Sequence, residues 1–181
     1  RGQYNGATNS KLFLLLSSFS KPWFPNKGKK LYIAVNKPVV MTEVVFGSYA
    51  FKYENRAGVQ YIFDPVRKKY VPLTPEEWVR QHVLQYLLNE KQYSPALIAV
   101  ERGIELNGLA KRFDVVVFDN TGAPRLLVEC KAPEEPLNEK VFTQIATYNL
   151  NLRVDYLWVS NGNHNFCCSL KQGIRLLQSV P

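Results

Sequence analysis

The sequence predicts an α/β sandwich in which helices flank a mixed central β-sheet. Residues 74–91 have a helical apolar spacing, and residues 111–132 hold two apolar strand-like runs joined by a turn. Residues 136–152 read as a second helix, and a further strand-like run follows at 154–160. The order is therefore helix, strand, strand, strand, helix, strand, and a chain of 181 residues is long enough for one such domain.

The first elements are a hairpin and a capped helix. The stretches VQYIFDP and VRKKYVPL predict two strands, because Asp64 and Pro65 break the first run. In the following TPEEWVRQHVLQYLLNEK, Thr74 suits the N-cap and Pro75 the first helical position. Glu77 completes a capping box, so we expect a helix to begin here.

The later elements are mostly strands. The stretch SPALIAVERGIEL predicts a strand pair or one long strand. KRFDVVVF (111–118) and RLLVECKA (125–132) predict two strands joined by the turn at 119–122. Residues 166–170 predict a last short strand, and the tail from Lys171 a terminal helix.

The net charge of +8 arises almost wholly from the first part of the chain. Residues 1–40 hold seven basic residues and no acid, which leaves 16 basic against 15 acidic residues in 41–181. We therefore interpret 1–40 as a basic N-terminal extension and 41–181 as the folded domain, whose nucleic-acid site must be a local patch. Met41, the single methionine, is either a buried side chain or the natural start.

The sequence indicates a cytoplasmic protein without a membrane span. Its apolar run at 12–16 is too short to cross a bilayer and short even for a secretory signal. Three cysteines without a C-x-x-C pair or Cys/His spacing argue against a disulfide framework and a zinc site.

Charged side chains interrupt the two most apolar strands. Asp114 opens VVVF, and Glu129 and Lys131 close LLV around Cys130. Because side chains alternate, Glu129 and Lys131 share one face, and antiparallel pairing can bring Asp114 close to Glu129. Two such carboxylates repel one another unless a divalent cation binds, and oxygen ligands suit Mg²⁺ or Mn²⁺. A nearby lysine can hold an attacking water or stabilise phosphate charge.

This set resembles the D…(D/E)-x-K signature of the PD-(D/E)xK nuclease superfamily, with its restriction-endonuclease-like sandwich. LLVECKAP, preceded by YIFDPVRKKYVPLTPEEWVRQ, resembles the N-terminal nuclease domain of type I restriction enzyme R (motor) subunits. Gln144 and Tyr148 are similar to the Q-x-x-x-Y motif of that family. The resemblance covers about residues 45–170.

The resemblance implies a Mg²⁺-dependent endonuclease that acts on double-stranded DNA. Asp114 and Glu129 would bind the metal, with the Cys130 carbonyl as a possible further ligand, and Lys131 would activate water. The helix residues Gln144 and Tyr148 would orient the site or contact the DNA backbone.

Such nucleases also place a glutamate on the first helix. Glu76 and Glu77 are both candidates, and we favour Glu76 because it faces the sheet and Glu77 is engaged in the cap. Arg67, Lys68 and Lys69 usually form a solvated turn, but they could also contact phosphate.

Other interpretations stay open. Asp114 could pair with Arg112, and Glu129 with Lys131, in purely structural ion pairs. The chain would then be a catalytically inactive DNA-binding module, or a domain that docks on separate motor or modification subunits. It has no G-x-x-x-x-G-K-[ST] loop, so we do not expect it to translocate DNA by itself.

Overall fold

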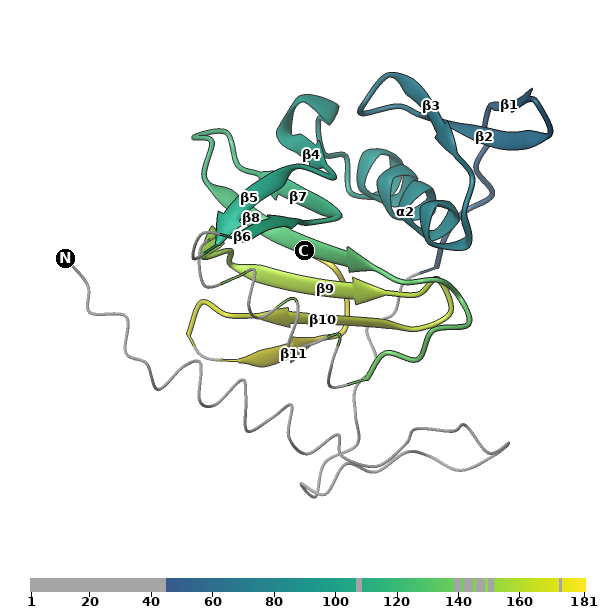
Figure 1. The fold of residues 1–181 in the computed structure, drawn as a ribbon. Coiled ribbons are helices and arrows are strands. Elements are labelled where there is room, and N and C mark those ends of the chain that lie inside the picture. Colours follow the sequence, from purple (N-terminus) through teal and green to yellow (C-terminus); the bar gives the residue numbers. More distant parts are fainter. Residues whose placement is uncertain are drawn as a thin grey trace, which may run out of the picture.

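A computed structural model describes residues 45–106, 109–138, 141, 145, 149, 152–172 and 174–181. Its centre is a six-stranded sheet in the order β11-β10-β9-β8-β7-β4 (Figure 1). β8 and β9 are parallel and the other neighbours antiparallel, so the predicted mixed sheet is confirmed and is compatible with a restriction-endonuclease-like fold. The six strands are β4 (Ile98–Val100), β7 (Val115–Phe118), β8 (Pro124–Cys130), β9 (Tyr156–Ser160), β10 (Asn165–Ser169) and β11 (Arg175–Leu177).

Two smaller sheets accompany the central one. β1 (Tyr53–Arg56), β2 (Val59–Asp64) and β3 (Lys69–Pro72) form an antiparallel three-stranded sheet, which contains the predicted hairpin. β5 (Gly103–Leu106) and β6 (Leu109–Arg112) form a separate pair.

Helix α2 (Pro75–Gln85) begins where its sequence predicts. The Thr74 side chain accepts a hydrogen bond of 3.0 Å from the backbone N–H of Glu77. A π-helical turn, η1 (Tyr86–Glu90), continues the helix, and a short 3₁₀ turn, η2 (Pro95–Leu97), leads into β4.

The β7–β8 hairpin is confirmed. Asp119 accepts hydrogen bonds from the backbone N–H groups of Thr121 and Ala123, and Gly122 takes a φ of +83° that suits glycine. The prediction of one strand over 111–118 is wrong, because the chain leaves β6 and enters β7 in another sheet. The break leaves Asp114 directly before β7.

The predicted terminal helix is also wrong, because the tail contains strand β11. Its backbone pairs with β10, with Cys167 opposite Leu177 and Ser169 opposite Arg175. A helix in so short a tail would be marginal, so sheet pairing prevails. Of the two interpretations of SPALIAVERGIEL, one long strand is wrong, since Glu101, with a φ of +48°, separates β4 from β5. The two strands do not pair with each other, because they belong to different sheets.

The apolar core lies on both faces of the central sheet. On one face Leu126 and Val128 pack with Val83 of α2, whereas Leu127 belongs to a second cluster that includes Ile145. Such alternation along β8 fixes which side each of its residues faces. The proposed extension 1–40 and most of the predicted helix 136–152 lie outside the described residues. None of the described helices combines the length and apolar character needed to span a membrane.

Candidate active site

Asp114, Glu129 and Lys131 meet at one end of the β7–β8 hairpin. Val115 pairs with Val128, so Asp114, one residue before, stands level with Glu129. Asp114 Oδ2 accepts a hydrogen bond of 2.6 Å from the backbone N–H of Cys130, and Lys131 Nζ lies 2.8 Å from Glu129 Oε1. The strand register therefore brings the three charged groups together.

Glu129 is a buried carboxyl, only 2% exposed. Burial raises its pKa to about 7, and the charge of Asp114 acts in the same direction, whereas Lys131 partly opposes both. Burial alone would lower the pKa of the Lys131 amine, but its hydrogen bond to Glu129 and the neighbouring carboxylates raise it overall. An additional cation at this site would therefore favour the ionised form of Glu129.

The raised pKa predicts how stability depends on pH without metal. Glu129 ionises near 4.5 in the unfolded chain and near 7 in the folded one, so the folded chain holds the extra proton between these values. This group's contribution to stability therefore falls as pH rises through that window. Glu129→Gln, which mimics the protonated acid, should raise the Tm above that of the parent at about pH 8, with a smaller gain near pH 5.

Melting curves in EDTA test this expectation. Glu134→Gln, an equal charge change at an exposed position, is the matched control and should show no such pH-dependent gain. A constant difference between Glu129→Gln and the parent at both pH values would contradict it.

Helix α2 contributes a buried guanidinium to the site. Arg80 Nη2 lies 2.6 Å from Glu76 Oε1 and 2.9 Å from Asp114 Oδ1, and Arg80 Nη1 contacts Glu77 Oε2. Burial opposes the charge of Arg80, but the carboxylates around it raise its pKa above the ordinary value. Since Cys130 and Arg80 hold one oxygen each, the orientation of the Asp114 carboxylate is fixed.

A second arginine connects the site to the β2–β3 turn. Arg67 Nε lies 2.7 Å from Asp64 Oδ2, Nη2 lies 2.8 Å from Glu77 Oε1, and Nη1 contacts Glu101. Gln81 donates to both Asp64 and Glu77 at 2.9 Å. The three-stranded sheet is thus held to α2 and to the end of β4 by buried charge.

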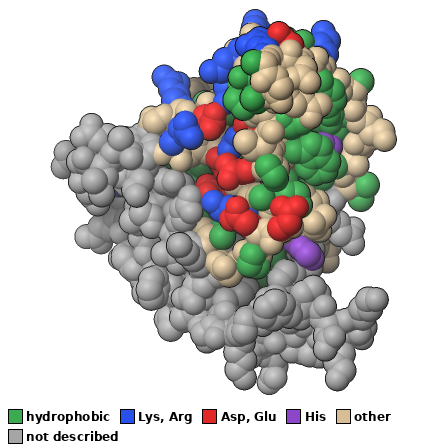
Figure 2. All heavy atoms as spheres, turned by 45° about the vertical axis from the view of Figure 1, so that its right-hand side comes forward, with side chains coloured by type: hydrophobic (Ala, Val, Ile, Leu, Met, Phe, Trp, Pro, Cys, Tyr) green, Lys and Arg blue, Asp and Glu red, His purple; other side chains and the backbone are tan. Residues whose placement is uncertain are grey.

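We call the whole set the carboxylate cluster. Its members are Asp64, Glu76, Glu77, Glu101, Asp114 and Glu129, with the cations Arg67, Arg80, Arg112 and Lys131. Six negative groups against four positive ones leave a formal charge of −2. Figure 2 shows red and blue side chains interleaved at the centre of one face, beside green apolar ones.

The helix glutamates differ in their surroundings. Glu77 makes half of the predicted capping box through its backbone N–H, but its buried carboxylate contacts arginines. The Glu76 side chain is 40% exposed. Burial raises its pKa, as does the charge of Asp114, whereas Arg80 and Lys131 lower it. Glu76 therefore lies within electrostatic reach of both Asp114 and Lys131.

Cys130 and the turn residues Arg67, Lys68 and Lys69 are the other predicted site residues that the structure describes. The Cys130 thiol is fully buried in the apolar core, where burial raises its pKa. Its carbonyl as a metal ligand stays a prediction. Lys68 and Lys69 are exposed on the turn, whereas the guanidinium of Arg67 contacts three carboxylates.

Gln144 and Tyr148 lie outside the described residues, so their predicted roles stay predictions. Sequence reasoning missed the participation of Arg80 and Asp64. Arg80 follows Glu76 and Glu77 by four and three residues, which is the spacing of helical ion pairs and could have indicated it.

No three His, Cys, Asp or Glu side chains among the described residues are arranged to hold a metal ion. Arg80 and Lys131 instead contact the carboxylate oxygens that would serve as ligands. The donor chemistry still fits a hard cation, because carboxylates predominate and the cluster has a formal charge of −2.

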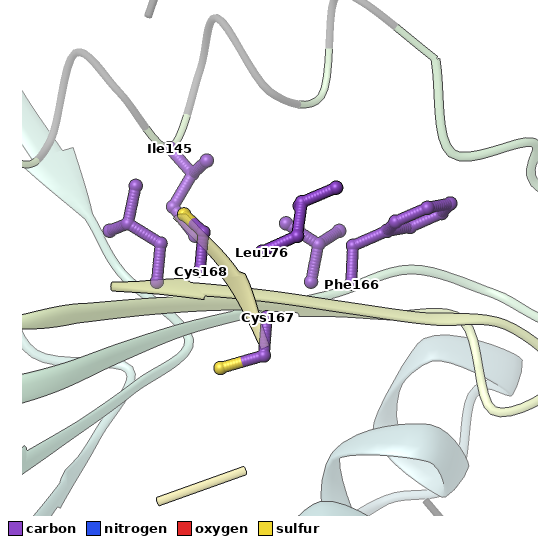
Figure 3. Close-up of a pocket in the computed structure, with 7 residues that line it drawn as sticks. Ile145, Phe166, Cys167, Cys168 and Leu176 are labelled. Carbon is purple, nitrogen blue, oxygen red and sulfur yellow. The ribbon is translucent and has the colours of Figure 1, made fainter. Parts of the chain in front are cut away.

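A small apolar cavity of about 30 Å³ lies elsewhere, against β9 and β10 (Figure 3). Cys168 lies on the same side of the sheet as Ile145, whereas Cys167 points to the opposite side. The cavity is about the size of one water molecule and includes no member of the carboxylate cluster, so we interpret it as imperfect packing.

Comparison with known proteins identifies the family. None of the curated proteins matches the chain. The family "Type I restriction enzyme R protein N terminus (HSDR_N)" matches residues 75–181, which include α2, the β7–β8 hairpin and more than half of the chain. The chain therefore belongs to the family of type I restriction enzyme R protein N termini.

Proposed function

We propose that the chain is a Mg²⁺-dependent endonuclease domain that hydrolyses phosphodiester bonds of double-stranded DNA. The observation that carries this proposal is the buried Glu129 carboxyl beside Asp114 and Lys131. Membership of a restriction enzyme family supports it. In this proposal, separate motor or modification subunits are further partners.

The proposed metal ligands are Asp114 and Glu129, joined by Glu76 and the Cys130 carbonyl. The raised pKa of Glu129 supports this assignment, because a bound cation would offset the charge repulsion from Asp114. Lys131 Nζ, now 2.8 Å from Glu129 Oε1, would have to release that oxygen. Mn²⁺ would fit the same oxygen ligands.

A bound Mg²⁺ would supply Lewis-acid polarisation of a phosphate oxygen and lower the pKa of a coordinated water. The Lys131 ammonium, once freed from Glu129, would position the attacking water or stabilise charge on the phosphate. Arg80 would keep Asp114 in a fixed orientation throughout, because it is itself held by Glu77. Gln144 and Tyr148 would orient these groups or bind the DNA backbone.

A second candidate function is a DNA-binding or subunit-docking module without catalysis. The arrangement of the described residues favours this candidate in one respect, because Arg80 and Lys131 contact the carboxylate oxygens that would otherwise bind a metal. Such a module need not bind divalent metal. Titration calorimetry with Mn²⁺ distinguishes the two candidates, since only the nuclease requires saturable binding.

Plasmid nicking tests the catalytic proposal directly. The full chain should convert supercoiled plasmid to the nicked form in Mg²⁺ or Mn²⁺, and EDTA should abolish this activity. Glu129→Gln should remove the activity, and Glu134→Gln, which alters an exposed glutamate, should retain it. Absence of both nicking and Mn²⁺ binding in the parent chain would refute the proposal.

A further inference from the structure

The sheet formed by β1, β2 and β3 lies outside the family match, which begins at residue 75. Its inward side packs into the molecule, because Ile62, Asp64 and Val71 are buried. Alternation along β2 therefore turns Tyr61 and Phe63 to the outward side. Tyr70 of β3 pairs with Phe63 and joins them there.

Rings and cations are stacked on this outward side. The ring centroids of Phe63 and Tyr70 are 5.3 Å apart. The Arg56 guanidinium lies 4.9 Å from the Tyr61 centroid and 5.7 Å from that of Tyr70, and Lys52 Nζ lies 5.8 Å from that of Phe63. We call these five residues the aromatic face. Its rings are half-buried and its two cations are exposed.

The charge around the aromatic face is positive. Four exposed basic residues lie on the face or at the adjoining β2–β3 turn, namely Lys52, Arg56, Lys68 and Lys69. The acidic residue that pairs with one of these four is Glu54, whose carboxylate lies 2.8 Å from the Arg56 guanidinium. Figure 2 shows blue side chains gathered at the top of the molecule, where Figure 1 has β1 to β3.

The β2–β3 turn connects the aromatic face to the carboxylate cluster along the chain. Arg67 precedes Lys68 in that turn, and its guanidinium contacts Glu77 and Glu101. Lys68 and Lys69, which follow Arg67, are exposed. Asp64 of that cluster is buried on the inward side of β2, whereas the rings lie on the outward side, so the two sites lie on opposite sides of this sheet.

We propose that the aromatic face binds single-stranded DNA. Aromatic rings and arginine planes stack with unpaired bases, and the surrounding cations neutralise phosphates. Duplex DNA keeps its bases stacked inside and cannot present them to the rings. The inference rests on the proposed function for the identity of the nucleic acid as DNA, and it adds an unpaired segment to the substrate.

Fluorescence anisotropy in EDTA with a labelled oligothymidylate of about 20 nucleotides tests this binding. The full chain should bind it more tightly than a duplex of equal length. Tyr61→Ala should weaken binding about tenfold or more. Lys52→Gln combined with Lys68→Gln should weaken it as well and reduce its salt dependence.

Tyr156→Ala is the matched control. Tyr156 also lies beside two cations, with Lys171 at 5.3 Å and Arg125 at 5.8 Å from its ring centroid. It is the first residue of β9, at the end of that strand away from the proposed nuclease site. This variant should bind as the parent does. Melting curves identify any variant that does not fold. If Tyr61→Ala does not fold, the affinity of the double lysine variant decides the test.

Equal affinity of the parent, of folded Tyr61→Ala and of the folded double lysine variant would overturn the inference. So would tighter binding of the duplex, or of an oligouridylate, than of the oligothymidylate. Binding is measured without metal, whereas nicking requires metal. Absence of nicking would therefore not contradict binding by the aromatic face, and absence of binding would not contradict the proposed nuclease.

Discussion

Lys131→Ala should abolish plasmid nicking and leave Mn²⁺ binding intact. A protonated amine cannot be a metal ligand, so the role of Lys131 must be toward water or phosphate. Removing one such electrostatic contact typically lowers the rate about a hundred- to a thousandfold. The substitution also frees Glu129 Oε1, which Lys131 contacts at 2.8 Å, so Mn²⁺ affinity should be unchanged or higher.

Asp114→Asn should remove both nicking and Mn²⁺ binding. The amide has nearly the volume of the carboxylate but lacks its charge, and hard cations depend on anionic oxygen. Asparagine is preferable to alanine here, because its amide oxygen can keep one of the two hydrogen bonds that Asp114 accepts from Cys130 and Arg80. The contrast between Lys131→Ala and Asp114→Asn separates the catalytic from the ligand role.

Calorimetry with Mn²⁺, single-turnover nicking and melting curves measure these effects. Lys171→Ala is a matched control, because Lys171 forms an ion pair of 3.1 Å with Asp155 on an exposed surface. It should nick at the parent rate. If Lys131→Ala nicks as fast as the parent, Lys131 has no catalytic role and the proposed mechanism is wrong.

The parts of the fold that could be predicted are those fixed by local chemistry. The cap at Thr74 and the turn around Gly122 depend on a few neighbouring residues, and both form as predicted. The proximity of Asp114 to Glu129 follows from the register of that hairpin. The division of 111–118 between two sheets depends on distant partners and could not be read from the apolar run.

The role of Arg80 depends on tertiary packing in the same way. Its spacing from Glu76 and Glu77 is local, but its contact with Asp114 exists only because α2 packs against the end of β7. Composition was a poor guide as well, since a chain with a net charge of +8 has a candidate site rich in carboxylates.

Arg80→Met should be among the most destabilising substitutions in the domain. The Arg80 side chain is 4% exposed and contacts Glu76, Glu77 and Asp114. Methionine fills much of the same space but removes the cation that Asp114 contacts and one of the two arginines that Glu77 contacts. Breaking a buried ion pair in this way costs about 3–5 kcal/mol in the free energy of unfolding.

Urea denaturation in EDTA measures this loss, and Arg112→Met is the matched control. The Arg112 side chain is 68% exposed and lies 3.2 Å from Glu101, so its removal should cost no more than about 1 kcal/mol. Glu77→Gln in the Arg80→Met background should recover part of the loss, because it removes a buried carboxylate that has lost its contact with Arg80. If Arg80→Met costs no more than Arg112→Met, the Arg80 guanidinium does not stabilise this site, and Asp114 must be oriented by the Cys130 N–H alone.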